Sequence, residues 1–283
     1  MQFAKKIMQK LGSLFFNYFA ASANFCGLNI FLTSAATVRR RNKPAFKVSN
    51  YGWLTSYRVK TFESKEPETL KWIEGMSSSD IFFDVGANIG LYSLWAAISR
   101  GVKTIAFEPS SLNYAQLNLN IFMNRLDSLI TAYPLACHDL ESLSVLNLSS
   151  MQWSGALSSF DNNVDQFGNF YHPVFRQGAY SVSLDNFCAL SQVYPTRIKI
   201  DVDGNEGYVI KGAMQILASS VQSVLVEISS NRSDHRIVMD TLRSLGFENI
   251  ASGDKHGSAS ATSQNLIFAK PKYYIQTDSF GIP

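Results

Sequence analysis

The chain has 283 residues, of which 46% are hydrophobic and 17% are charged, and its formal net charge is +3. This apolar content is ample for a sizeable core, and the length suits one large domain or a domain with an appendage. Much of the basic excess lies in the first 43 residues, so a nucleic-acid partner is not indicated. Cys26, Cys137 and Cys188 are far apart and form no Cys-x-x-Cys pair, which indicates reduced thiols in a cytoplasmic compartment and no zinc site.

Residues 1–43 are predicted to form a basic, aromatic-rich helical appendage to a domain that spans residues 44–283. Three lysines precede the aromatic-rich residues 11–20, and three arginines follow at 39–41. Glycine and asparagine residues interrupt the apolar run, so a continuous membrane-spanning helix is not expected. The helix could pack on the domain or on a second subunit, or it could lie on anionic lipid as a peripheral membrane contact. A cleaved signal peptide is a further interpretation.

The remainder of the chain alternates between strand and helix patterns. Helices are predicted at residues 61–75, 91–98, 112–123, 207–217 and 235–245,. Buried strands are predicted at residues 81–85, 104–107, 130–135, 144–148, 197–201, 221–228, 247–250 and 266–268,. Repeated β-α-β units predict an α/β fold with a mostly parallel sheet, helices on both faces and an antiparallel last strand. A ligand then binds at the carboxyl ends of the strands.

The alternating pattern lapses between residues 149 and 181. This stretch holds many aromatic residues among Ser, Asn and Gly, and it is long for an inert connection. A lid or substrate-recognition insertion is the functional interpretation, and a decorated loop or a dimer contact is the alternative. Within it, Trp153 could stack on a sugar face or bury itself under the insertion, and His172 could act as a base.

The turn after the first strand has the composition of a cofactor site. Asp84 ends the strand, and the turn continues through Gly86, Ala87 and Asn88 to Gly90. A dinucleotide fold instead has G-x-G-x-x-G at this place, and a carboxylate at its mouth would repel the pyrophosphate. An anion there suits a cofactor with positive charge beside the turn. The sulfonium and ammonium groups of S-adenosylmethionine are such charges.

Glu108 ends the second predicted strand, about twenty residues further along the chain. An acid in this position can accept hydrogen bonds from both ribose hydroxyls of a nucleoside cofactor. The ribose of a nicotinamide cofactor would be bound in the same way. A nicotinamide-dependent oxidoreductase on a similar sheet is therefore the alternative enzyme, although the missing third glycine and Asp84 argue against it.

Three carboxylates follow the strand at residues 197–201, namely Asp201, Asp203 and Glu206. The end of that strand faces the same crevice as Asp84 and Glu108, so these acids must be solvated, paired or bound to a cation. One of them could take the proton of an acceptor hydroxyl, or Asp201 could hold that hydroxyl through a divalent metal ion. Alternatively, Asp201 bonds its own turn, and Asp203 and Glu206 cap the following helix.

Several motifs follow one another along the chain: FDVGANIGLYS at residues 83–93, AFEP at 106–109, SLD at 183–185, IKIDVDGNE at 198–206, KGA at 211–213 and VE at 226–227. In this order they resemble the FkbM-type S-adenosylmethionine-dependent methyltransferases. The resemblance covers roughly residues 60–270. It implies a class I methyltransferase fold and O-methylation of a hydroxyl, often on a sugar or a polyketide.

The resemblance also implies roles for particular residues. Asp84, Gly86 and Gly90 would surround the methionine end of the cofactor, Glu108 would hold the ribose, and the segment ending in Asp139 would hold the adenine.

The chain departs from the family at two positions within the third motif. The family usually has Glu where this chain has Asp203, and often an aromatic residue where it has Asn205. The shorter side chain keeps the charge but retracts it by one methylene group. The acidity of the site is therefore retained, while a contact that depends on reach is not assured.

These patterns together predict an S-adenosylmethionine-dependent O-methyltransferase that acts on a hydroxyl of a carbohydrate or another small molecule. The protein is expected in the cytoplasm, with an oligomer and a peripheral membrane contact left open. A non-catalytic, membrane-attached interaction module is the alternative that involves no chemistry.

Overall fold

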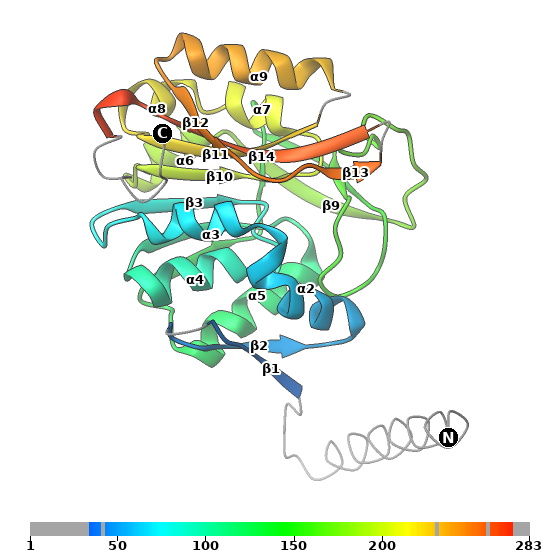
Figure 1. Ribbon diagram of the computed structural model, residues 1–283. Helices are drawn as coiled ribbons and strands as arrows, with labels where there is room; N and C mark the ends of the chain where they lie inside the picture. Colours follow the sequence, from blue (N-terminus) through cyan, green and yellow to red (C-terminus); the bar gives the residue numbers. More distant parts are fainter. Residues whose placement is uncertain (1–33, 41–42, 230–231, 259–260, 274–283) are drawn as a thin grey trace, which may run out of the picture. The chain divides into compact units, whose positions relative to one another are not determined.

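The computed structural model describes residues 34–40, 43–229, 232–258 and 261–273 (Figure 1). The chain divides into the units Met1–Ala35 and Ala36–Pro283, and the description below concerns the second unit. Most of the predicted appendage, residues 1–43, lies outside the described residues. In the described part of the chain, no helix has the length and apolar character needed to cross a lipid bilayer.

The main sheet has the strand order β12-β14-β11-β10-β3-β4-β5, with β13 beside β14. Strands β3, β4, β5, β10 and β11 are parallel, and β14 is antiparallel to its neighbours. This arrangement confirms the predicted α/β fold with a mostly parallel sheet and an antiparallel last strand. The strands are β3 Ile81–Val85, β4 Lys103–Phe107, β5 Ile130–Tyr133, β10 Arg197–Ile200, β11 Ser223–Ser229, β12 Glu248–Ser252, β13 His256–Ser258 and β14 Ala261–Ala269.

Helices cover both faces of this sheet (Figure 1). They are α2 Trp53–Lys65, α3 Pro67–Glu74, α4 Leu91–Arg100, α5 Ser111–Asn124, α6 Leu184–Ser191, α7 Glu206–Lys211, α8 Met214–Ser219 and α9 Ser233–Ser244. On one face, Phe83 and Ile198 pack with apolar residues of α6 to α9. On the other face, Phe82 and Leu225 pack with apolar residues of α3, α4 and α5. Coverage on both faces explains why the parallel strands are nearly continuous apolar runs.

Two predicted helices are each divided in the structure. The pattern at residues 61–75 belongs to α2 and α3, which separate where Pro67 occupies the first turn of α3, because proline cannot donate the backbone hydrogen bond that a continuous helix needs. The pattern at residues 207–217 belongs to α7 and α8, separated at Gly212 and Ala213. A Cβ atom on Gly212 would lie 2.1 Å from the backbone oxygen of His138, so the chain passes too closely there for a side chain.

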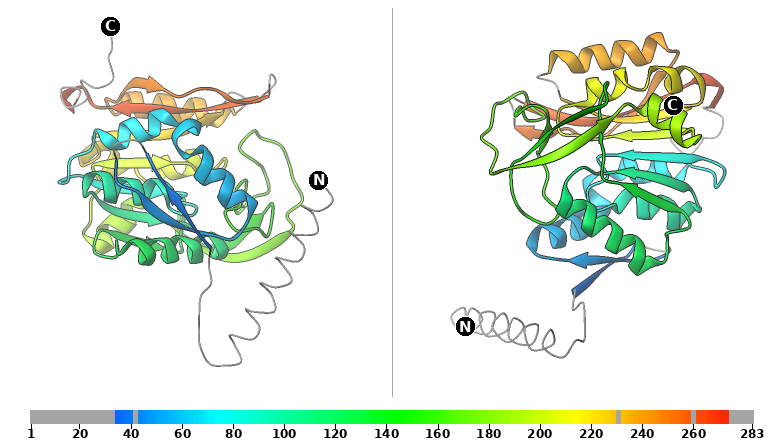
Figure 2. Two further views of the ribbon diagram at one scale, coloured as in Figure 1. Left: turned by 60° about the horizontal axis from the view of Figure 1, so that its bottom comes forward. Right: turned by 180° about the vertical axis from the view of Figure 1, so that it is seen from behind.

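A second sheet has the order β6-β9-β7-β8. Its strands are β6 Ala136–Cys137, β7 Ser142–Leu148, β8 Ser159–Phe160 and β9 Phe175–Val182, coloured in greens in Figure 2. β7 and β9 pair antiparallel along their length. The predicted insertion at residues 149–181 is therefore irregular only in part, because its last seven residues belong to β9. The structure also has a two-stranded sheet of β1 Ser34–Val38 and β2 Phe46–Asn50, which was not predicted from the sequence.

Candidate active site

A cavity of about 250 Å³ lies at the carboxyl ends of β3, β4, β10 and β11. Its wall includes Gly86 after β3, Glu108 after β4, Asp201 and Asp203 after β10, and Glu227 near the end of β11. The position agrees with the rule that open α/β sheets bind ligands beyond the carboxyl ends of their strands.

The turn between β3 and α4 requires glycine at two positions. Gly86 has φ +80°, and a Cβ atom there would lie 1.9 Å from the backbone oxygen of Asp201. Gly90 has φ +81°, and its Cβ would lie 2.3 Å from Leu117 Cδ1. The backbone N–H groups of Gly86 and Ala87 both donate to the Phe107 oxygen, at 3.0 Å each. The turn is therefore fixed against β4 and β10 by contacts that leave no room for side chains at these glycines.

Glu108 reaches the cavity with both carboxylate oxygens held in place. Its Oε2 accepts a hydrogen bond from Asn88 N at 2.8 Å, and its Oε1 accepts one from Ser110 N at 2.8 Å. Burial raises the pKa of Glu108 to about 7, although these two N–H groups favour the carboxylate,. Each oxygen has a further lone pair, so the carboxylate can still accept hydrogen bonds from two hydroxyls. This geometry suits the ribose role predicted for Glu108.

Asn88 links the same turn to the excursion, the segment of residues 149–174 between β7 and β9. Its side-chain nitrogen donates to the Gly155 oxygen at 2.6 Å, and Asn113 Nδ2 donates to that oxygen at 3.0 Å. Gly155 and the three residues that follow it line the cavity. The excursion thus supplies part of the wall, although its predicted role in recognising a substrate stays a prediction.

Asp84 lies below the cavity instead of on its wall. The residue is 1% exposed, and it is absent from the cavity lining. Its Oδ2 accepts a hydrogen bond from Ser93 Oγ at 2.6 Å, while its Oδ1 has no hydrogen-bond partner. Burial raises the pKa of Asp84. The prediction that Asp84 sits at the mouth of the turn was therefore wrong in position, because that place is taken by Val85 and Gly86.

Lys199 is the buried cation between the two acidic motifs. It is 1% exposed and pairs in register with Asp84 on the neighbouring strand. Its Nζ lies 2.7 Å from Asp201 Oδ2 and 5.1 Å from the centre of the Tyr92 ring. Burial alone would lower the pKa of Lys199, but the charges of Asp201, Asp84 and Glu66 outweigh it and raise the pKa. Lys199 therefore balances the charges of both strand ends.

Asp203 holds the excursion against the loop after β10. Its Oδ2 accepts hydrogen bonds from Leu157 N at 2.6 Å and Ser158 N at 3.3 Å. The residue has φ +56°, a left-handed conformation that Asp tolerates better than most residues. Burial raises the pKa of Asp203 to about 7, with the charges of Asp201 and Glu206 adding to the effect. Asp203 lines the cavity, but its Oδ2 already accepts hydrogen bonds from two backbone N–H groups.

Glu206 does not line the cavity and instead holds the loop that leads into α7. Its Oε1 accepts hydrogen bonds from Val202 N at 3.2 Å and Gly204 N at 3.1 Å. His235 Nε2 lies 2.9 Å from Glu206 Oε2, and His235 Nδ1 accepts from Ser229 N at 2.7 Å, so Nε2 carries the hydrogen. Glu206 is 1% exposed and absent from the cavity lining. The structure thus separates Glu206 from the other two acids of the predicted catalytic set.

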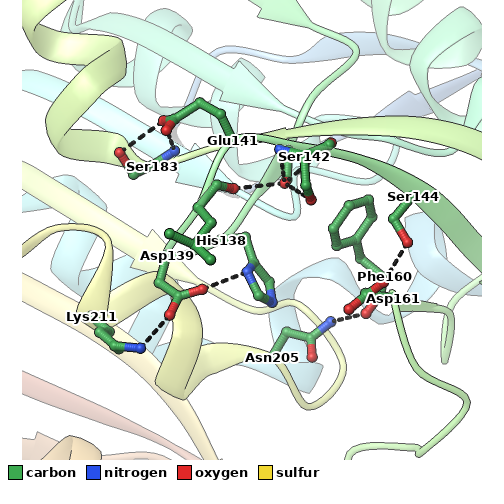
Figure 3. A network of polar contacts seen from close by, with 12 residues as sticks. His138, Asp139, Glu141, Ser142, Ser144, Phe160, Asp161, Ser183, Asn205 and Lys211 are labelled. Atoms are coloured by element: carbon green, nitrogen blue, oxygen red, sulfur yellow. Dashed lines mark hydrogen bonds and ion pairs between the residues drawn. The ribbon is translucent and has the colours of Figure 1, made fainter.

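Asp139 is engaged in polar contacts with His138 and Lys211 (Figure 3), and it is absent from the cavity lining. It lies 2.7 Å from His138 Nδ1 and is also bonded to Lys211. Burial works against ionisation, but the hydrogen bond from Lys211 and the charge of His138 hold the pKa of Asp139 below its usual range. The predicted adenine segment reaches the cavity through Ala136 and Cys137 instead.

The two predicted substrate residues are absent from the cavity lining. Trp153 stacks on Tyr51 with the ring centres 4.2 Å apart, and His172 is exposed on the excursion. Phe160 and Gln166 line the cavity from this part of the chain instead. Of the two interpretations given to Trp153, the structure agrees with packing inside the protein.

Several cavity residues had no assignment from the sequence. Arg58, Lys65 and Glu66 come from α2 and the start of α3, and Asn265 comes from β14. Burial opposes ionisation of Glu66, but the charges of Lys65 and Lys199 lower the pKa of Glu66 to about 2. Nothing in the pattern of α2 indicates that it lines the cavity, whereas Glu227, near the end of β11, was predicted either to line the acceptor side or to pair with Arg232 or Lys199, and it lines the cavity.

Within the described ranges, no group of three or more His, Cys, Asp or Glu side chains is arranged to hold a metal ion. These residues therefore offer no set of ligands for the divalent metal ion that was considered at Asp201.

The glycine turn, the acid after β4 and the cavity at the strand ends define a Rossmann-like protein with a site for a nucleoside cofactor. The sequence model of the family described as Methyltransferase FkbM domain matches residues 84–248, more than half of the chain. The chain therefore belongs to the FkbM methyltransferase family, which confirms the resemblance seen in its motifs. The family implies S-adenosylmethionine as the cofactor.

Three relatives illustrate the range of similarity. The "31-O-demethyl-FK506 methyltransferase FkbM" of Streptomyces tacrolimicus is 25% identical over 199 residues, which cover 62% of this chain and 75% of the relative. The crystal structure of methyltransferase FkbM from Methylobacillus flagellatus KT has a TM-score of 0.45 and 16% identity, over 68% of this chain and 44% of that one. This chain thus spans less than half of that protein. TYW2 of P. horikoshii in complex with MeSAdo has a TM-score of 0.45 and 12% identity, over 84% and 71% of the two chains.

The residues of the cavity fit S-adenosylmethionine. Gly86 lets the turn approach β10 without a side chain between them. Glu108 offers hydroxyls a carboxylate that is already fixed by two backbone N–H groups. Ala136 and Cys137 give a less polar wall beyond Glu108, as an adenine ring requires.

Proposed function

We propose that the chain transfers a methyl group from S-adenosylmethionine to a hydroxyl of a carbohydrate or another small molecule. The carrying observation is that Glu108 from β4 and Asp201 and Asp203 from β10 line one cavity of about 250 Å³. A cofactor-binding acid and a set of acids beyond it are the two halves that methyl transfer needs. The name of the Streptomyces tacrolimicus relative, which refers to an O-demethyl compound, also supports an oxygen acceptor.

The donor half comprises the turn from Gly86 to Gly90, together with Glu108. Glu108 would accept hydrogen bonds from the ribose hydroxyls, and the backbone of the turn would follow the methionine end. When bound, S-adenosylmethionine supplies an electrophilic methyl group on a positively charged sulfur. Asp84 would act from below the turn as a buried charge, because its side chain does not line the cavity.

The acceptor half comprises the acids that follow β10. Asp201, fixed by Lys199 at 2.7 Å, would orient the acceptor by a hydrogen bond. Asp203 would keep residues 157 and 158 of the excursion against the cavity. Catalysis would then depend mainly on holding the acceptor oxygen in line with the transferred methyl group, since such positioning contributes several kcal/mol to methyl transfer.

The partners of the protein outside the cavity remain predictions. We propose the cytoplasm as its location, and peripheral membrane contact through residues 1–43 is tested by fractionation with and without that segment. Partition into the soluble fraction in both cases would refute the membrane contact.

The function is tested with methyl-labelled S-adenosylmethionine and extracts that contain glycans and hydroxyl-bearing small molecules. We expect a product that gains one methyl group, detected by mass spectrometry, and calorimetric binding of S-adenosylmethionine but not of NADH. Binding of NADH in its place would favour an oxidoreductase. Absence of labelled product from every fraction would refute the methyl-transfer proposal.

A further inference from the structure

Glu227 is the acid of the cavity that comes from β11. β10 and β11 are parallel, and Ile200 pairs in register with Val226. One residue further along, Asp201 and Glu227 therefore stand side by side at the ends of the two strands. Both line the cavity.

The other acids of the wall already have partners that fix their charge or their geometry. Asp201 Oδ2 lies 2.7 Å from Lys199 Nζ, and Glu66 Oε1 lies 2.8 Å from Lys65 Nζ. Glu108 accepts two backbone N–H bonds and Asp203 accepts two more. These carboxylates are structural or binding groups, because each is held by a cation or by backbone N–H groups.

Glu227 differs from these acids in its surroundings. Ser263 is a polar neighbour that favours the charged form of the Glu227 side chain, and within the described part of the chain no cation lies at ion-pair distance from it. A carboxylate that shares a cavity with other acids and has no cation of its own gains most from receiving a proton.

We propose that Glu227 is the catalytic base of this cavity, which binds the acceptor hydroxyl and receives its proton. The inference rests on the methyl-transfer function proposed above. The acceptor oxygen forms a bond to the methyl carbon while the carbon–sulfur bond breaks, and that electron pair passes to the sulfur. The hydroxyl proton passes to the Glu227 carboxylate, which then releases it to solvent.

The electrostatics of the cavity agree with this role. Burial raises the pKa of Glu227 well above its usual range, and the charges of Asp201, Glu206 and Asp203 raise it further. A raised pKa makes this carboxylate a stronger base than an ordinary exposed glutamate. Two neighbouring acids in different environments are a recurrent arrangement in which one keeps its charge and the other exchanges a proton. Asp201, next to Lys199, is the first of these, and Glu227 is the second.

The test compares wild type, Glu227→Gln and the control Glu141→Gln. Gln keeps the shape of Glu but cannot take up the proton. Glu141 also accepts a backbone N–H bond, from Ser183 N at 3.0 Å, but lies outside the cavity. With labelled S-adenosylmethionine and the extracts described above, we expect Glu227→Gln to lose about 100-fold or more in the rate of transfer at saturating cofactor. Its dissociation constant for S-adenosylmethionine should stay within about twofold of wild type, and Glu141→Gln should match wild type in both measurements.

A second variant covers the case in which Glu227→Gln does not fold. Glu227→Ala leaves space for a small carboxylate, so added formate should restore part of the transfer rate, which a purely structural role would not allow. Transfer by Glu227→Gln within about threefold of wild type would overturn the assignment, as would a fall in cofactor affinity equal to the fall in rate. If wild type transfers no methyl group to any fraction, the proposed function fails, and the role of Glu227 fails with it.

Discussion

Replacement of Glu108 by Gln tests the donor half of the cavity directly. Gln keeps the shape of the side chain but replaces one carboxylate oxygen with an NH₂ group. Either Asn88 N or Ser110 N, each 2.8 Å from a Glu108 oxygen, would then face a donor instead of an acceptor. An unpaired buried donor costs about 1–3 kcal/mol, and each ribose bond would lose about 1 kcal/mol without the charge of the acceptor.

The unpaired donor lowers the stability of the free and the bound protein alike, so it does not enter the binding energy. The two ribose bonds account for an expected loss of about 2 kcal/mol of binding energy, or about 30-fold in the dissociation constant of S-adenosylmethionine. Isothermal titration calorimetry measures it, with Glu141→Gln as the control outside the cavity. The loss should be equal for S-adenosylhomocysteine, because the two molecules share the ribose. An affinity within about twofold of wild type would refute the ribose assignment. A loss confined to S-adenosylmethionine would mean that Glu108 acts on the sulfonium charge.

The same variant predicts a change of stability with pH. Burial raises the pKa of Glu108 from 4.5 to about 7 in the folded chain. Its contribution to stability is therefore complete below the unfolded value, near pH 4, and is lost as the pH rises through 7. Wild type should lose on the order of 3 kcal/mol relative to Glu108→Gln between pH 4 and pH 8. Urea unfolding of both proteins across this range measures the difference, and a difference independent of pH would contradict the proposed burial of the charge.

Three further variants probe the surroundings of the cavity. Gly86→Ala should lower the free energy of unfolding by at least about 2 kcal/mol and abolish cofactor binding, since the new Cβ would meet a backbone oxygen at 1.9 Å,. Gly178→Ala, with no atom within 4 Å of the new Cβ, is the control that should unfold like wild type. Lys199→Met should cost about 3–5 kcal/mol by leaving buried acids unpaired, and addition of Asp84→Asn should recover part of this loss; no recovery would refute the pairing. Glu206→Gln should lower the melting temperature and leave the dissociation constant of S-adenosylmethionine unchanged. Weaker cofactor binding at unchanged stability would instead show that Glu206 takes part in cofactor binding.

The fold could be predicted from the sequence wherever burial on both faces produced a continuous apolar run. Such runs give β3, β4, β10 and β11 nearly to the residue,. Strands of the second sheet follow no such pattern, because one face of β9 is exposed at alternate residues. The pattern at residues 207–217 could not show the break at Gly212, where the chain passes close to the backbone of His138, some seventy residues away along the chain.

The sequence predicts which residues lie near the site, but not how deeply each side chain is buried. Asp84 and Glu108 both stand at the end of a strand, yet Glu108 follows β4 and reaches the cavity, whereas Asp84 lies inside β3 and is buried. Asp84 pairs in register with Ala106, two residues before Glu108, so Glu108 stands nearer the open end of the strands, and the motifs alone do not specify this register. Similarly, the sequence does not show that Glu206 pairs with His235 of α9, whose Nε2 lies 2.9 Å from Glu206 Oε2.

The charges around the cavity separate the two cofactors that the sequence left open. Among the described residues, five acids line the cavity, Glu66, Glu108, Asp201, Asp203 and Glu227, against the two cations Arg58 and Lys65. At about 5 Å and an effective dielectric constant of about 20, one like-charge pair costs about 3 kcal/mol. A pyrophosphate would bring two negative charges into this acidic wall, whereas a sulfonium brings one positive charge. The lining therefore favours S-adenosylmethionine through the same excess of acid that leaves Glu227 without a cation.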